Sequence, residues 1–221
     1  ITARFFDNSL TFDLTFYQSN TRKQTFLRPI TVAEGYSNEY VQTGNVRNRG
    51  LELSIGYNKT WGDFSWSSSF TYSMNRNKII ELLDDEDEVI NVGGLNGANV
   101  ILKKGGTMGD VYIYTEFARD REGKIALDAS GNVIRTILTD PIYRGSVLPK
   151  GNFGFSNDFT WKGINLGFLL TARVGGIVMS QTQAILDYYG VSQATADARL
   201  AGGIPVNTGK ISAEQYYSVV G

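Results

Sequence analysis

The feature that most constrains the fold is a two-residue alternation of apolar and polar side chains in residues 152–174. In residues 152–161 the aromatic side chains occupy one parity and small polar residues the other, and the alternation resumes at 164–174 after Lys162-Gly163; only Asn157 and Leu169 break it. Successive side chains of a β-strand point to opposite faces. The pattern therefore predicts two long antiparallel strands joined by a tight turn, each with an apolar and a polar face.

The same alternation recurs upstream, in residues 9–24, 44–60 and 64–80, and residues 1–6 have the character of a strand end. Residues 51–57, for example, read L-E-L-S-I-G-Y. A strand needs about 9–11 residues to span a bilayer. The three upstream segments and the last strand exceed or meet this length, and residues 151–161 just meet it.

The connections between these segments alternate in length. Short turns at 7–8, 61–63 and 162–163 alternate with long connections at 25–43, 81–150 and 181–221. Hairpin loops in compact domains are usually two to five residues long, whereas outer-membrane barrels combine short periplasmic turns with long extracellular loops. All three tryptophans lie in or near a short turn, as expected for the aromatic girdle of such a barrel.

A soluble β-sandwich also has alternating strands, but the loop asymmetry and the tryptophan positions favour an all-β, antiparallel transmembrane β-barrel segment with long extracellular loops. Five or six strands cannot close a barrel, which needs about eight, and open edges are not tolerated in lipid. We therefore expect residues 1–221 to be part of a longer protein. Within the long connections, the pattern predicts strands at 110–117 and 124–127 and a short helix at 193–200.

Composition argues against an enzyme. The chain has no cysteine and no histidine, and its formal net charge is −1. Thiolate and most zinc sites, the commonest general base and a strong field for nucleic acid are thereby missing, so we expect no catalytic residue, metal or cofactor. A carboxylate glycosidase would need two carboxyl groups about 5–10 Å apart, and no pair stands out.

Several motifs carry a family resemblance. Residues 43–53, TGNVRNRGLEL, resemble the N-x-G-x-E-L element that enters a barrel strand in TonB-dependent transporters. A second set closely resembles the C-terminal third of SusC/RagA-type transporters of Bacteroidetes; it comprises residues 140–146, 151–157, 173–176, 190–192, 195–199 and 214–217.

The resemblance implies a 22-stranded, plugged barrel that crosses the outer membrane many times. It also implies import of oligosaccharides, or of peptides in some members, with energy from TonB and with a SusD-like surface lipoprotein as partner. The plug, the TonB box and the last strands of the family pattern are expected outside this chain. The alternative is a soluble β-rich glycan-binding module, which would hide its apolar faces between two sheets, whereas a barrel turns them outward.

Candidate ligand contacts lie in the long connections. Asp110, Tyr112, Tyr114 and Phe117 alternate, as aromatic platforms for sugars do, and Asp187-Tyr188-Tyr189 has a similar composition. A loop sheet that packs on itself, or that docks the lipoprotein, explains the same pattern. On the long strands the inward parity carries Arg4, Asp13, Glu52, Asp158 and Arg173, whose mixed signs suggest pairing with the plug or across strands.

The outward parity predicts a basic collar at its loop-side end, formed by Arg22, Arg47, Arg49, Arg76 and Lys78; the opposite end carries only Lys59. Arginine binds phosphate well, so we expect these side chains to contact lipopolysaccharide. A β-bulge at Gly50 would reverse the parity and remove the collar.

Three other features admit a ligand or a plain structural role. The acidic run 84–88 could bind Ca²⁺ or form a solvated loop tip. Asn45, Asn48 and Gly50 could touch substrate or shape the strand entry. The glycines at 93–97 and 105–106 match no phosphate-binding loop and are expected in loops.

Overall fold

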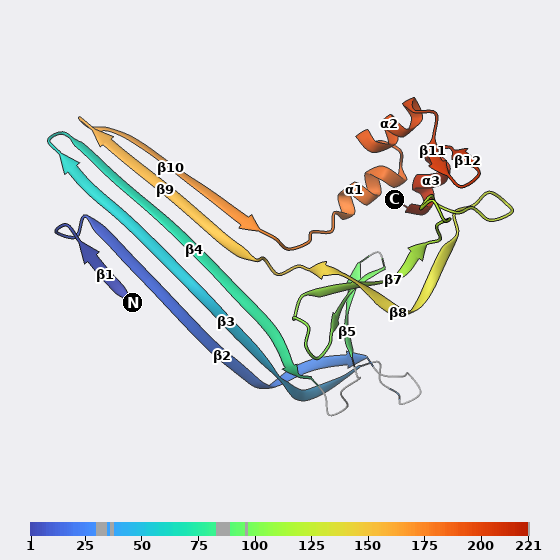
Figure 1. The fold of residues 1–221 in the computed structure, drawn as a ribbon, viewed down its shortest axis with the longest axis horizontal. Helices are drawn as coiled ribbons and strands as arrows, with labels where there is room; N and C mark the ends of the chain where they lie inside the picture. The colour runs from blue at the N-terminus through green and yellow to red at the C-terminus, as the bar shows by residue number, and fades with distance from the viewer. Residues whose placement is uncertain (30–34, 36–37, 83–88, 96, 221) are drawn as a thin grey trace. The chain divides into compact units, whose positions relative to one another are not determined.

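The computed structural model describes residues 1–29, 35, 38–82, 89–95 and 97–220. Its main element is a six-stranded antiparallel sheet in the order β1-β2-β3-β4-β9-β10 (Figure 1). The strands of this sheet are β1 (Thr2–Phe5), β2 (Leu10–Pro29), β3 (Asn38–Trp61), β4 (Phe64–Glu81), β9 (Gly151–Trp161) and β10 (Ile164–Val174). The alternating segments of the sequence are thus confirmed as neighbouring strands.

The remaining elements belong to the long connections. A four-stranded sheet has the order β5-β6-β7-β8, and β11 pairs with β12. Their bounds are β5 (Ile90–Leu95), β6 (Ala98–Leu102), β7 (Asp110–Phe117), β8 (Arg135–Ser146), β11 (Ile204–Val206) and β12 (Gly209–Ile211); the helices are α1 (Gln181–Tyr188), α2 (Gln193–Leu200) and α3 (Ala213–Val220). No helix in the described part of the chain is long and apolar enough to cross a bilayer.

The structure corrects the expected connection at 25–43. β2 and β3 remain paired as far as Pro29 and Asn38, so much of this segment is a strand hairpin. Backbone pairing does not require an apolar face. Where both faces of a sheet meet water the alternation disappears, although the strands continue.

The connection at 81–150 is also more regular than expected. The predicted strand at 110–117 is confirmed as β7. The predicted strand at 124–127 is wrong, because this segment forms only isolated bridges. Tight turns flank it on both sides: the Asp120 carboxylate accepts hydrogen bonds from the backbone N–H groups of Glu122 and Lys124, and the Asp128 carboxylate accepts them from those of Ser130 and Asn132. These N–H groups hold the pKa of Asp128 below its usual value, with that of Asn132 contributing most.

The helices begin at serines. The predicted helix at 193–200 is confirmed as α2, whose N-cap Ser192 accepts a hydrogen bond from Thr195 N–H at 3.2 Å. Ser180 caps α1 in the same way. At α3, Ser212 and Gln215 satisfy each other's backbone N–H groups at 3.1 Å, which is a capping box.

The described chain divides into two compact units. The first, here called the sheet unit, comprises Ile1–Gly93, Val100–Val111 and Gly145–Ile177; the second, the loop unit, comprises Gly94–Asn99, Tyr112–Arg144 and Val178–Gly221. Each has a small apolar core of its own. In the sheet unit it is formed by Val46, Ile79, Leu82, Ile90 and Leu102; in the loop unit it is formed by Ile125, Val133, Val206 and Ile211.

Strand register separates the two faces of the long sheet. Leu53 is opposite Leu14 and Tyr72 on the apolar face, and Ser54 is opposite Asp13 and Thr71 on the polar face. Gly50 pairs with Asn75 in unshifted register, and the one irregularity between β3 and β4 lies between Asn45 and Val46. The alternative of a parity-reversing bulge at Gly50 is therefore wrong.

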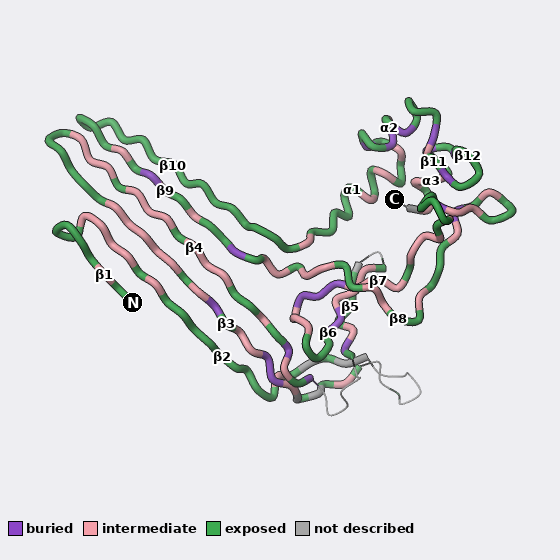
Figure 2. The backbone as a smooth tube through the Cα atoms, viewed as in Figure 1, coloured by how far each residue is buried: buried purple, intermediate pink, exposed green. Residues whose placement is uncertain are grey.

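The apolar face is not buried. Most of the long strands are half-buried or exposed (Figure 2), and on the inner strand β9 the side chains of Phe153 and Phe155 are 36% and 40% exposed. A soluble module would bury this face between two sheets. Its exposure therefore supports the transmembrane interpretation.

Aromatic rings gather near the short turns. The rings of Trp61 and Phe64 stack at 6.1 Å, and those of Trp66 and Phe159 stack at 6.2 Å. Asn157, which interrupts the apolar parity, is 3% exposed and accepts a hydrogen bond of 3.0 Å from Trp66 Nε1. This polar residue thus satisfies the indole N–H of its neighbour.

The polar face contains a close approach at Gly50. The ring of Tyr17, opposite Gly50 in register, lies directly over its α-carbon, and a Cβ at position 50 would be 2.2 Å from Tyr17 Cζ. Only glycine leaves room for the ring in this position.

We expect Gly50→Ala to destabilise the full-length receptor by about 1–3 kcal/mol, because the added methyl overpacks against the tyrosine ring. Unfolding in detergent micelles measures this effect. The double variant Tyr17→Ser/Gly50→Ala should recover most of the loss, because the ring is gone. A Gly50→Ala variant as stable as the parent would show that the contact does not constrain the sheet.

Candidate functional site

The first candidate region is the polar face of the long sheet. The predicted inward residues all lie on it, in register with small polar partners: Asp13 with Ser54, Glu52 with Ser73, Asp158 with Ser67 and Arg173 with Asn152. Asp13 and Glu52 line one hollow of about 590 Å³, together with Thr15, Ser73 and Thr171. Leu169, the exception on β10, lines the same hollow.

These charged side chains bind neutral groups. Asp13 Oδ1 accepts a hydrogen bond of 2.6 Å from Thr2 Oγ1, and Arg173 Nη2 donates one of 2.7 Å to the Val147 carbonyl. Asp158 lies against Gly167, where an added Cβ would be 2.6 Å from its Oδ1. Among the described residues none of them forms an ion pair. The predicted cross-strand pairing is therefore wrong, and pairing with a plug remains a prediction.

The second candidate region is the alternating set on β7, two members of which have clear structural contacts. Asp110 is 5% exposed, and its carboxylate accepts hydrogen bonds from the backbone N–H and the hydroxyl of Thr107. Phe117 packs against the core of the loop unit, with the Arg135 guanidinium 5.9 Å from its ring centre. Both side chains hold local structure. Phe117 also lines the larger hollow of the loop unit, described below, and ligand contact by either residue stays a prediction.

Tyr112 and Tyr114 are the other two predicted ligand contacts on β7. The ring of Tyr112 meets that of Tyr143 edge-on at 5.5 Å, and Tyr114 is half-buried. Packing of this small sheet on itself accounts for Tyr112. Neither tyrosine lines the hollows described next.

The most open aromatic surface lies at the end of α1. The side chains of Tyr188 and Tyr189 are 54% and 72% exposed, and their rings meet edge-on at 5.1 Å. Both line two hollows of the loop unit, of about 720 and 390 Å³. Asp187, the third residue of this motif, lines the smaller hollow and accepts a hydrogen bond of 2.8 Å from Gln183 Nε2.

The smaller hollow combines charged and neutral polar groups. It is lined by the carboxylates of Asp187 and Glu214, by Arg199 and by the Tyr217 phenol. Arg199 donates a hydrogen bond of 2.9 Å to the Gly190 carbonyl. Burial raises the pKa of Tyr217, and the negative charge of Asp187 raises it further. The phenol therefore remains a hydrogen-bond donor at neutral pH, and the hollow offers rings, donors and acceptors to a polar organic ligand.

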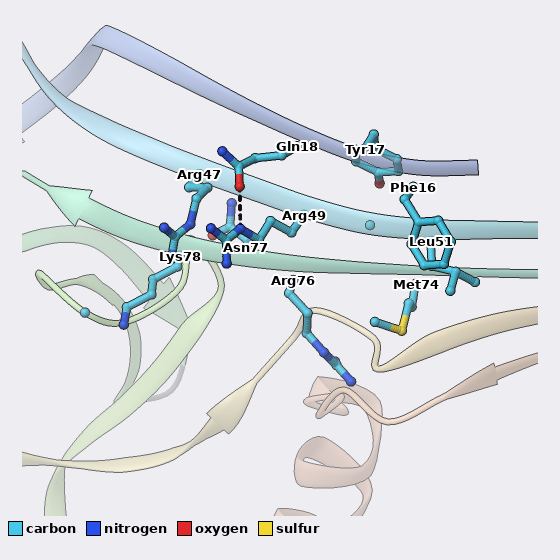
Figure 3. A pocket seen from close by; sticks show the side chains of 12 residues that line it. Phe16, Tyr17, Gln18, Arg47, Arg49, Leu51, Met74, Arg76, Asn77 and Lys78 are labelled. Carbon is cyan, nitrogen blue, oxygen red and sulfur yellow. Dashed lines mark hydrogen bonds between the residues drawn. The ribbon is translucent and has the colours of Figure 1, made fainter. Parts of the chain in front are cut away.

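The predicted basic residues lie on the apolar face. Arg47, Arg49, Arg76 and Lys78 line a hollow of about 840 Å³, and Phe16, Leu51 and Met74 line it as well (Figure 3). Sequence analysis did not identify these apolar residues as part of the collar; only cross-strand register brings Phe16 beside Leu51. Arg22 has the same parity, opposite Asn45, but does not line the hollow.

The remaining candidates have structural contacts or lie outside the described residues. Asn45 is buried and accepts a hydrogen bond of 2.9 Å from Asn20 Nδ2, and Asn48 accepts from Asn75 and Asn77. These contacts fit a role in strand entry. The acidic run 84–88 lies outside the described residues, among which no group of three or more Asp or Glu is arranged to hold a metal ion.

Comparison with known proteins identifies the sheet. Residues 1–99 match the family described as "TonB dependent receptor-like, beta-barrel". Over 229 aligned positions, covering 92% of this chain, the sequence is 30% identical to TonB-dependent receptor P3 of Formosa agariphila. The chain belongs to the TonB-dependent receptor family. It is a segment of an outer-membrane β-barrel, and it spans 22% of the length of that relative.

Solved structures agree on the fold. The RagAB peptide transporter matches with a TM-score of 0.66 at 22% identity, over 88% of this chain and 22% of that one. The RagAB peptide importer in its "closed-closed" state matches with a TM-score of 0.60 at 24% identity, over 79% of this chain and 20% of that one. The long strands of this TonB-dependent receptor thus form part of a barrel wall.

We expect Asp110→Asn to loosen the turn before β7 without weakening ligand binding, because hydrogen bonds to a charged group contribute about 1.5–3 kcal/mol each and the carboxylate is buried. Hydrogen exchange of residues 107–111 in the full-length receptor should accelerate at least tenfold. Asp187→Asn is the matched control, because its carboxylate lies on the exposed α1, and it should leave this segment unchanged. Lost ligand binding with unchanged exchange would restore Asp110 as a ligand contact.

Proposed function

We propose that the complete receptor actively imports oligosaccharide or peptide nutrients across the outer membrane, with energy supplied through TonB. The observation that carries this proposal is the two-faced sheet of a TonB-dependent receptor. Its apolar face is exposed where lipid would contact it, and its polar face carries a hollow lined by Asp13, Glu52 and hydroxyl side chains. On this proposal the polar face is the lumen wall, and Asp13, Glu52, Asp158 and Arg173 face the plug or the moving ligand.

The division of labour within the whole protein follows from the same proposal. Residues 1–221 supply a part of the barrel wall and its extracellular loops. The plug, the TonB box and the last strands belong to the rest of the receptor, so contact with TonB is made there. The chain itself contributes binding surfaces and no catalytic step.

The ligand contacts we propose are Tyr188 and Tyr189. Their exposed rings border both hollows of the loop unit, and exposed aromatic rings offer a large contact area to sugar rings or to peptide side chains. Asp187, Arg199 and Glu214 beside them supply donors and acceptors for hydroxyl or amide groups. Tyr112 and Tyr114 remain weaker candidates.

The partner we propose is a SusD-like surface lipoprotein. The loop unit exposes several large apolar side chains, among them Val178, Val191 and Leu200. Exposed apolar groups on extracellular loops are suited to a protein partner. The names of the similar solved structures describe RagAB as a peptide importer, which makes peptides as reasonable a cargo as oligosaccharides.

We expect Tyr188→Ser/Tyr189→Ser to weaken ligand binding by the full-length receptor about tenfold, since each lost aromatic contact costs about 0.5–1.5 kcal/mol. Calorimetry with defined oligosaccharide and oligopeptide pools measures the affinity. Ile137→Ser is the matched control, because Ile137 is an exposed apolar residue of the same unit that lines neither hollow. An equal loss in both variants would argue against tyrosine contacts.

Uptake tests the proposed function itself. A strain lacking the full-length receptor should lose accumulation of one labelled pool, oligosaccharide or oligopeptide, and the complemented strain should recover it. A protonophore should abolish this uptake, because TonB draws on the proton gradient. Unchanged uptake of both pools in the deletion strain, or uptake that survives the protonophore, contradicts active import.

A further inference from the structure

The basic residues on the apolar face form like-charged cross-strand pairs. Arg49 is directly opposite Arg76, and Arg47 is directly opposite Lys78. Directly opposed side chains in antiparallel strands have Cβ atoms about 4.5–5.5 Å apart, and like charges in such positions destabilise the pairing. The sheet therefore concentrates four positive charges where they repel one another.

The described residues do not offset this repulsion with an ion pair, although Glu81 on β4 lies three residues beyond Lys78, opposite Asn45. Within the described residues none of the four cations forms an ion pair. On β2, their neighbours in register are the neutral residues Gln18 and Asn20, and Gln18 accepts a hydrogen bond from Arg49 Nε. Two opposed pairs of cations, none of them in an ion pair with a described carboxylate, are the arrangement that an anionic ligand would stabilise.

The position of the pairs along the strands indicates where that ligand lies. The outward parity of β3 runs from Trp61 at the short turn, past Lys59, to Leu51, after which Arg49 follows. At about 3.4 Å per residue and a tilt of about 40°, this segment rises about 26 Å along the membrane normal. The apolar band of an outer-membrane barrel is about 25 Å tall, so Arg49 and Arg76 lie at the headgroups of the outer leaflet.

The hollow has an apolar end as well as a cationic one. In Figure 3, Phe16, Leu51 and Met74 form a group, and the cationic side chains lie further along the same strands. These three residues are the last apolar ones before the charges, and they continue the face that contacts hydrocarbon. A free anion would contact only the cationic end of the hollow, whereas an anionic lipid would contact both the cationic and the apolar end.

We propose that this hollow binds the phosphorylated glycolipid of the outer leaflet. Arg47, Arg49, Arg76 and Lys78 hold its phosphate groups through charge-assisted hydrogen bonds, and Phe16, Leu51 and Met74 contact the upper part of an acyl chain. The ligand is recognised by two features together, a pair of phosphates and several acyl chains. At the short-turn end of the same face, the basic residues are Lys59 and the turn residue Lys162. The proposed site therefore lies in the outer leaflet and has no counterpart in the inner leaflet.

The test uses the full-length receptor in phosphatidylcholine nanodiscs, titrated with bisphosphorylated lipid A. Arg49→Gln/Arg76→Gln should lower the affinity at least tenfold. Lys59→Gln/Lys162→Gln removes the same number of charges at the short-turn end, and it should leave the affinity unchanged. Without lipid A, Arg49→Gln/Arg76→Gln should melt at the parent's temperature or above, because repulsion is relieved, and this shows that the variant folds.

Two further probes distinguish lipid from phosphate alone. Monophosphorylated lipid A should bind more weakly than the bisphosphorylated form, and inorganic phosphate at millimolar concentration should not displace the lipid. Equal affinity in both charge variants, equal binding of the two lipids, or displacement of the lipid by millimolar inorganic phosphate would each overturn the proposal.

Discussion

The rest of the structure depends on the pairing of backbone N–H and C=O groups between neighbouring long strands. In hydrocarbon no water can replace these hydrogen bonds, so a strand that crosses a bilayer must be paired on both sides. The pairing also fixes register, and a slip of one residue would exchange the two faces of a strand. The exposed apolar face, the hydroxyl-lined polar face and the opposed cations are therefore consequences of one register, which runs unshifted between β2 and β3 from Leu10 to Pro29.

Residues that break the alternation are accommodated without changing that register. Asn157 has an apolar parity, but its amide oxygen accepts the indole N–H of Trp66 among stacked rings; its amide nitrogen is buried without a partner among the described residues. Gly50 lacks a side chain, and the ring of Tyr17 covers its α-carbon, as aromatic residues do opposite strand glycines. Both solutions act across strands, which keeps the pairing continuous where the sequence is irregular.

The long strands could be predicted from the sequence because their two faces meet different solvents, which produces an alternation of apolar and polar residues. Where both faces meet the same solvent, the alternation is absent and the prediction failed. Beyond the bilayer both faces of the β2–β3 hairpin meet water, so the strand extension to Pro29 leaves no alternation to read. The helices α1 and α3 were not predicted, although Ser180 and Ser212 are recognisable caps. Asp110 was predicted to contact ligand because it alternates with tyrosines on β7. Its hydrogen bonds to Thr107, three residues earlier, could not be predicted from that alternation. The apolar end of the basic hollow depends on which residues are opposite each other, and a single strand does not contain that information.

The distribution of charge on the apolar face follows from the cost of placing cations in lipid. Arg or Lys on the lipid face of a barrel costs about 2–4 kcal/mol at the bilayer midplane and about 0–1 kcal/mol near the interfaces. Between Leu51 and Tyr57 on β3, and between Met74 and Phe64 on β4, the apolar parity contains no charged residue, whereas Arg49 and Arg76 follow at once beyond it. A need for solubility alone would be met by charges of either sign at this height. The two directly opposed cation pairs are a costly arrangement for the isolated sheet and a favourable one beside phosphate, so their sign reflects the chemistry of the outer leaflet.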